Sequence, residues 1–86
     1  MADAAKSPEM AAWLKDVAES LKIEDNPLPG AQEALLDMTS SVAHGPSRTG
    51  APLTNFLVGY AAGKLGVDAA EAARAVAEQA DTWQMK

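Results

Sequence analysis

One short segment of this chain gathers residue types that could do chemistry or bind a charged group. His44 is the chain's single histidine, and Ser47, Arg48 and Thr49 follow it within five residues. A histidine close to a serine could form a nucleophile–base pair, and an arginine among hydroxyls could bind a phosphate or a carboxylate. The segment therefore raises two hypotheses, a hydrolytic site and an anion- or partner-binding site.

The hydrolytic hypothesis lacks a third group. A nucleophile–base pair needs an orienting carboxylate and an oxyanion hole, yet no acidic residue lies between Asp37 and Asp68. Glu24 and Asp25 are adjacent acids in a polar turn, where a carboxyl lacks the burial that general acid catalysis requires. One histidine, no cysteine and no metal-ligand spacing predict that no metal is bound. We expect a protein that is not an enzyme and has no cofactor.

The binding hypothesis depends on the position of the segment. It leads into the N-terminus of a predicted helix, where free backbone N–H groups and the helix dipole favour anions. The candidate partner- or anion-binding residues are His44, Ser47, Arg48, Thr49 and Lys64. The structural alternative is that Arg48 caps the preceding helix or pairs with an acid, while His44 helps to end that helix. The sequence leaves both interpretations open.

Length and composition narrow the class of protein. The 86 residues form one domain, and the net charge of −5 argues against a nucleic acid partner. No run of about 18 apolar residues exists to span a membrane, and the N-terminus lacks the apolar stretch of a signal peptide. A chain without cysteine fits a reducing compartment, so we expect a cytoplasmic protein.

Four segments carry helix signals, and together they predict an all-α fold, a compact four-helix bundle with short connections over residues 1–86. Helices are expected at about 8–22, 31–43, 52–65 and 69–84, with 1–6 disordered. Ser7-Pro8 and Asp68 start helices, and Gly66 and Gly45 end them, Gly45 in the left-handed cap conformation.

Periodicity predicts which faces point inward. In the third helix, a stripe of large apolar residues is expected to face the core: Leu53, Phe56, Leu57, Tyr60, Ala61 and Leu65. Trp13 and Phe56 are the expected core centre. Gly59 and Gly63 form a flat edge that should pack on the alanine face of the fourth helix, with a self-association face as the alternative.

The central segment resembles a known family. Trp13-Leu14, Val42-Ala43-His44, Arg48, Ala51-Pro52-Leu53, Phe56-Leu57, Gly59 and Ala61-Ala62-Gly63 are similar to the pattern of a small actinobacterial helical domain of unknown function. That domain occurs alone or attached to molybdenum cofactor guanylyltransferases, and the similarity runs from Met10 to about Glu78. The resemblance implies a link to molybdenum cofactor biosynthesis, as a docking or helper module, and brings no catalytic mechanism.

These observations predict a non-catalytic accessory module that contacts a protein partner through the loop at 44–53. The suspected partner is a molybdenum cofactor enzyme, and a homodimer stays open. The alternative is direct binding of a phosphorylated small molecule, a pterin or a nucleotide, at the N-terminus of the third helix. A weak enzyme with His44 as general base is a third hypothesis.

Overall fold

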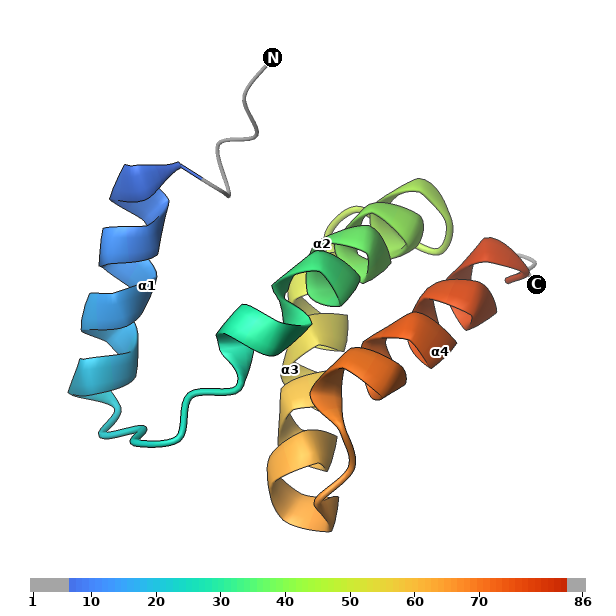
Figure 1. Ribbon diagram of the computed structural model, residues 1–86. Coiled ribbons are helices and arrows are strands. Elements are labelled where there is room, and N and C mark those ends of the chain that lie inside the picture. The colour runs from blue at the N-terminus through green and yellow to red at the C-terminus, as the bar shows by residue number, and fades with distance from the viewer. Residues whose placement is uncertain (1–6, 84–86) are drawn as a thin grey trace.

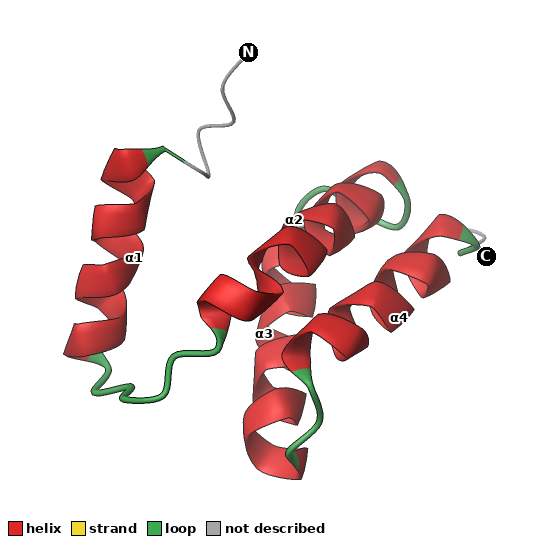
Figure 2. Ribbon diagram, viewed as in Figure 1, coloured by secondary structure: helices red, strands yellow, loops and turns green. Residues whose placement is uncertain are grey.

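The computed structural model describes residues 7–83 and confirms the all-α prediction with four helices (Figures 1 and 2). The helices are α1 (Pro8–Ser20), α2 (Leu28–His44), α3 (Gly50–Leu65) and α4 (Ala69–Asp81). Residues 1–6, for which the sequence predicts disorder, lie outside the described residues, as do 84–86. No helix within 7–83 combines the length and the apolar character needed to cross a bilayer.

Three of the expected helix ends are confirmed by their capping groups. The Ser7 hydroxyl accepts a hydrogen bond from the Met10 amide over 3.1 Å, and an Asp68 carboxylate oxygen accepts one from the Glu71 amide over 2.9 Å. Gly66 ends α3 with φ 75°, a left-handed conformation in which a glycine costs least. These caps satisfy amides and carbonyls that the helix ends would otherwise leave unpaired.

The start of α2 lies earlier than the sequence suggests. Pro29 and Gly30 belong to its first turn rather than to the connection, because a proline there lacks only an N–H that would have no intrahelical partner. The Asn26 side chain accepts a hydrogen bond from the Leu28 amide over 2.9 Å and so supports this start. Similarly, α3 begins at Gly50, two residues before Pro52.

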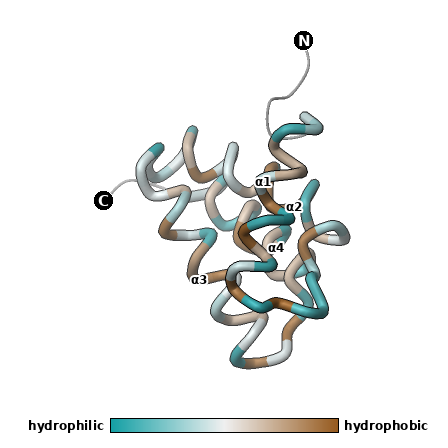
Figure 3. Tube along the Cα trace, turned by 90° about the vertical axis from the view of Figure 1, so that its left-hand side faces the viewer, coloured by the Kyte–Doolittle hydropathy of each residue, from teal (hydrophilic) through white to brown (hydrophobic). Residues whose placement is uncertain are grey.

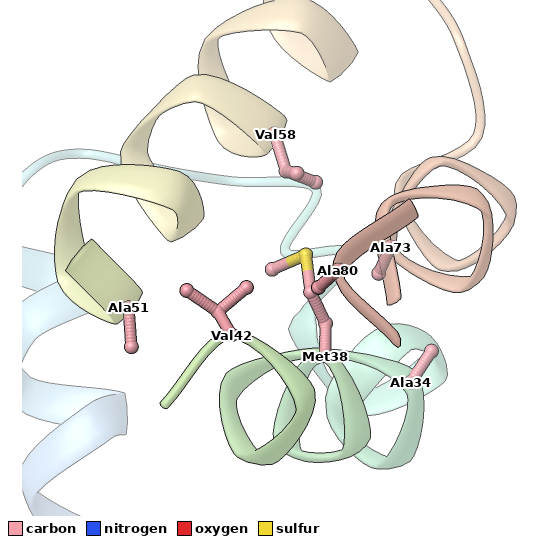
Figure 4. Packing of buried hydrophobic residues seen from close by; sticks show 7 residues of the cluster. All are labelled: Ala34, Met38, Val42, Ala51, Val58, Ala73 and Ala80. Atoms are coloured by element: carbon pink, nitrogen blue, oxygen red, sulfur yellow. The ribbon is translucent and has the colours of Figure 1, made fainter. Parts of the chain in front are cut away.

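The core lies between α2, α3 and α4, and α4 packs mainly on α2 (Figure 4). Met38 of α2 and Ala73 of α4 are both completely buried. The remaining buried cluster consists of Ala34, Val42, Ala51, Val58 and Ala80. Because six of these seven side chains are alanine or valine, the helices approach closely around Met38, the one large side chain within residues 7–83 that is completely buried.

The first helix, α1, stands beside this core (Figure 1). None of its Cα atoms comes within 8 Å of a Cα atom of α2, α3 or α4. The expectation that Trp13 marks the core centre is therefore wrong, since its side chain is 61% exposed. An apolar stripe runs along α1 and consists of Met10, Trp13, Leu14, Val17 and Ala18. None of the other described helices packs closely against it.

The third helix packs on the core with the face opposite to the one that its large apolar residues predicted. Phe56, the other expected core centre, is 68% exposed, and Leu53, Leu57 and Tyr60 are exposed with it. The buried side chains of α3 are Ala51 and Val58, which lie on the other side of the helix. This helix carries apolar residues around its whole circumference, so periodicity alone could not choose between its faces.

Two predictions about glycines are also wrong. Gly45 ends α2 with φ −99° rather than in the left-handed region. The position requires a glycine because there is no room for a side chain. A Cβ there would lie 2.8 Å from the Ala80 carbonyl oxygen and 2.9 Å from the Ser41 carbonyl oxygen. Gly59 and Gly63 do not pack on α4, because a Cβ at either position would meet nothing within 4 Å.

Candidate binding site

The loop between α2 and α3 is short and closed by its own hydrogen bonds. The Ser47 amide donates to the Val42 carbonyl over 3.0 Å, so the chain reverses directly after α2. The hydroxyls of Ser47 and Thr49 lie 3.0 Å apart and form a hydrogen bond at the surface. Three of the predicted site residues, Ser47, Arg48 and Thr49, are thereby held on one exposed turn.

His44 is engaged with its own helix. Its Nδ1 lies 2.8 Å from the Ser40 carbonyl oxygen and 3.4 Å from the Ser40 hydroxyl. Since a carbonyl oxygen can only accept, Nδ1 carries the proton and donates. The ring thus satisfies a carbonyl in the last turn of α2, where the helix dipole also favours a histidine. This geometry supports the structural interpretation of His44, because an Nδ1 that donates to the Ser40 carbonyl cannot also accept a proton from the Ser40 hydroxyl.

Arg48 has no such engagement. Its side chain is exposed, and within residues 7–83 its guanidinium forms no hydrogen bond or ion pair. It neither caps α2 nor pairs with an acid, which were its two structural explanations. The Arg48 carbonyl does accept a hydrogen bond from the Ala51 amide over 3.3 Å, so the backbone is ordered while the charged group is free to meet a partner.

The N-terminus of α3 offers fewer amides to an anion than the sequence suggested. The Gly50 amide donates to the Ser47 carbonyl over 3.1 Å, and the Ala51 amide donates to Arg48. Pro52 has no N–H. The first three residues of the helix therefore have no free amide donor, and the Thr49 side chain makes no capping hydrogen bond. An anion here would depend on side chains alone.

Lys64 does not join this group of residues. It lies in the last turn of α3, and the rise of 1.5 Å per residue places it about 21 Å along the helix from Gly50. The structure therefore does not place Lys64 in one site with the other candidate residues. His44, Ser47, Arg48 and Thr49 stay together at one end of the molecule, and Lys64 lies at the other.

A hollow beside the loop was missed by the sequence reasoning. It has a volume of about 440 Å³ and opens between α3, α4 and the loop. Pro46 and Gly50 of the loop line it, together with Leu57 of α3 and with Val76 and Trp83 at α4 and beyond its end. The small side chains of Ala72 and Ala80 on α4 also line it, and Trp83 is 49% exposed at the rim.

A second, wider groove lies on the other side of α3. It has a volume of about 810 Å³ and is lined by residues of α1, α2 and α3. Leu14 and Val17 of α1 face it, with Gly59 and Gly63 on the α3 side. The groove is wide because α1 stands away from the other helices. Among residues 7–83, no three side chains of the metal-ligating types lie together.

Comparison with known proteins identifies a family. The domain of unknown function DUF6457 matches residues 5–86, nearly the whole chain, and the chain belongs to this family. No curated protein and no solved structure matches. The resemblance to a small domain of unknown function is thus confirmed. Because the family has no assigned function, a function for this chain has to be inferred from the candidate site.

Proposed function

Because membership of this family assigns no activity, we propose from the site that the chain is a non-catalytic module that binds a protein partner at the α2–α3 loop. The observation that carries the proposal is the apolar hollow next to Arg48, whose guanidinium has no hydrogen-bond or ion-pair partner within residues 7–83. Protein interfaces commonly combine an apolar pocket for an anchoring side chain with a polar rim. Pro46 and Gly50 line the hollow, and Arg48 lies between them on the same loop.

The charge of the loop favours an acidic rim on the partner. From Met38 to Val67 the chain has no acidic residue, and Arg48 extends from an exposed turn within this segment. A partner carboxylate could form a bidentate pair with the guanidinium, supported by the Ser47 and Thr49 hydroxyls. An apolar partner side chain would enter the hollow between Val76 and Trp83. Neither contact requires a catalytic group.

The partner we propose is an enzyme of molybdenum cofactor biosynthesis, of the guanylyltransferase class. The support for this choice is the resemblance of the central segment to a domain attached to such enzymes. We further propose that the chain works in the cytoplasm. The alternative ligand, a phosphorylated pterin or nucleotide, receives less support, because the first amides of α3 are already bonded.

Calorimetry with a purified guanylyltransferase tests the proposal. Arg48→Glu and Trp83→Ala should each weaken binding at least about 10-fold, since they remove the charged contact and one wall of the hollow. Arg74→Glu on the exposed side of α4 is the matched control and should bind like the wild type. Absence of binding by the wild type would reject this partner. Equal binding by all variants would reject the surface.

Titration with inorganic phosphate and with a guanine nucleotide separates the two ligand classes. The protein-binding proposal expects no saturable heat from either. Saturable heat that disappears in Arg48→Glu would instead establish the small-molecule alternative.

A further inference from the structure

We propose that two copies of this chain form a homodimer in which α1 of each copy covers the outer face of α3 of the other. The outer face of α3 is defined by the exposed side chains of Leu53, Phe56, Leu57 and Tyr60. Each chain therefore carries one unpacked amphipathic helix and one uncovered apolar helix face, and a second copy supplies what each of them lacks.

The outer face of α3 consists of large apolar side chains of the kind usually found in a protein interior. Its four side chains are between 58% and 70% exposed, and the rings of Phe56 and Tyr60 stack with their centroids 6.1 Å apart. Figure 3 shows hydrophobic positions recurring along the α3 trace. A helix that is apolar on all sides is ordinarily buried on all sides. In one isolated chain, half of this helix would face water.

The amount of exposed surface matches what a stable dimer buries. The chain exposes 6582 Å², whereas a compact monomer of 8.9 kDa exposes about 4,800 Å². Full exposure of the nine residues outside 7–83 would explain on the order of 1,000 Å² of this excess. The remainder is on the order of 800 Å², about the area that each partner buries in a standard interface.

The outer face of α3 is too small to supply this area alone. Its four exposed side chains present on the order of 500 Å². Trp13 and Leu21, which are 61% and 65% exposed on the α1 stripe and just after it, add the missing area. An interface that uses both elements from both copies is also self-complementary, as a twofold dimer requires.

The charges of the two elements are complementary. Along α1, Glu9, Asp16 and Glu19 outnumber Lys15, whereas α3 has no acidic residue and carries Lys64 in its last turn. At 100° per residue, Glu9 and Asp16 fall along one edge of the apolar stripe of α1. Lys64 follows Tyr60 by one turn on the outer side of α3. A docked α1 therefore places its acidic residues beside α3, which is the one described helix without an acidic residue.

The connection between α1 and α2 leaves α1 free to reach a second copy. Between Ser20 and Leu28 the chain forms an exposed turn and bend segment, with Lys22 in the left-handed region at φ 59°. No backbone of α1 approaches the other helices, so little packing has to be broken. Exchange of a terminal helix between identical chains is a known low-cost route to a dimer.

Sedimentation equilibrium on the full chain tests the proposal, with the fluorescence of Trp13 as the second measurement. The background is Trp83→Phe, which leaves Trp13 as the single indole. We expect a mass of twice 8.9 kDa with a dissociation constant that is micromolar or tighter. Over the same concentration range, the emission of Trp13 should shift to the blue as its ring becomes buried.

Phe56→Glu should weaken the dimer at least about 100-fold, because it places a charge at the centre of the buried face. Its helical circular dichroism should be unchanged, since the Phe56 side chain is 68% exposed in the single chain. Ala75→Glu adds the same charge on the exposed side of α4 and should dimerise like the wild type. Binding of the guanylyltransferase through Arg48 would persist in Phe56→Glu when that change is made in the wild-type chain with Trp83 intact, which keeps this test separate from that of the proposed function.

Three results would overturn the proposal. If the chain is a monomer with exposed Trp13 at all concentrations, neither the apolar stripe of α1 nor the outer face of α3 binds a second copy. A monomer with a blue-shifted, concentration-independent Trp13 would mean that α1 closes on its own chain. A dimer whose Trp13 emission never shifts would place the contact elsewhere.

Discussion

The Asn55 side chain donates a hydrogen bond to the Thr39 hydroxyl over 3.1 Å, joining α3 to α2 near the middle of both helices. The same hydroxyl donates to the Leu35 carbonyl over 2.8 Å, so Thr39 both bridges the helices and satisfies its own helix. Both residues are half-buried. This polar contact fixes which part of α3 meets α2 in a core of otherwise apolar side chains.

Removing the bridge should lower the free energy of unfolding. Thr39→Val keeps the side-chain shape and leaves the Asn55 amide with one partner fewer, at an expected cost of about 1–2 kcal/mol. Urea unfolding of Thr39→Val, Asn55→Ala and the double variant should give a coupling energy of about 1 kcal/mol. Thr54→Val is the control, because its hydroxyl donates only to the Gly50 carbonyl of the same helix. Strictly additive effects would show that the bridge contributes nothing.

Gly45→Ala should destabilise the fold by about 1–3 kcal/mol through overpacking. The new methyl group would lie 2.8 Å from a backbone oxygen of α4, which cannot move without shifting the helix. Chemical denaturation is the measurement. Gly30→Ala is the matched control, since a Cβ there meets nothing within 4 Å and its unfolding free energy should hardly change. Equal stability of the two variants would contradict the close approach of Gly45 to Ala80.

Met38→Ala should cost about 2–5 kcal/mol, because it removes the one large side chain that is completely buried within residues 7–83. For a domain of this length that is a large part of the total stability, so thermal unfolding should begin near room temperature. Met38→Leu nearly conserves the volume and should cost less than about 1.5 kcal/mol. A small effect of Met38→Ala would place the centre of the core elsewhere.

Asp68→Ala should destabilise α4 by about 1 kcal/mol, because the Glu71 amide loses its acceptor. Asp81→Ala removes an equal charge at the opposite end of the same helix, where an acid opposes the helix dipole. Its unfolding free energy should stay equal or rise slightly. Thermal denaturation of the two variants at low salt therefore tests the direction of the effect as well as its size.

The helices themselves could be predicted from the sequence because their signals are local. Ser7, Asp68 and Gly66 act within one turn of the backbone, and each behaves as its residue type predicts. The inward face of α2 was also predictable, since Ala31, Met38 and Val42 recur on one side and are buried. Local chemistry fixed the elements wherever one face was clearly more apolar than the other.

The orientation of α3 and the position of α1 could not be predicted in this way. Large residues such as Phe56 suggested the inward face, but small ones such as Ala51 allow α3 to approach α2 closely. The Arg48 loop was found because its residues are adjacent in the sequence. The hollow beside it was missed because Pro46, Leu57 and Trp83 come together only through the packing of α3 and α4.

The pairing of α2 with α4 has a consequence for how the chain folds. Met38 and Ala73 are both completely buried and share one cluster, yet they are 35 residues apart in the sequence. Helices as short as these are marginal in water on their own. During synthesis, the apolar side chains of α2 therefore stay exposed to solvent until α4 has left the ribosome. We infer that the nascent chain folds in one late step, and that its exposure to aggregation and to chaperones ends only then.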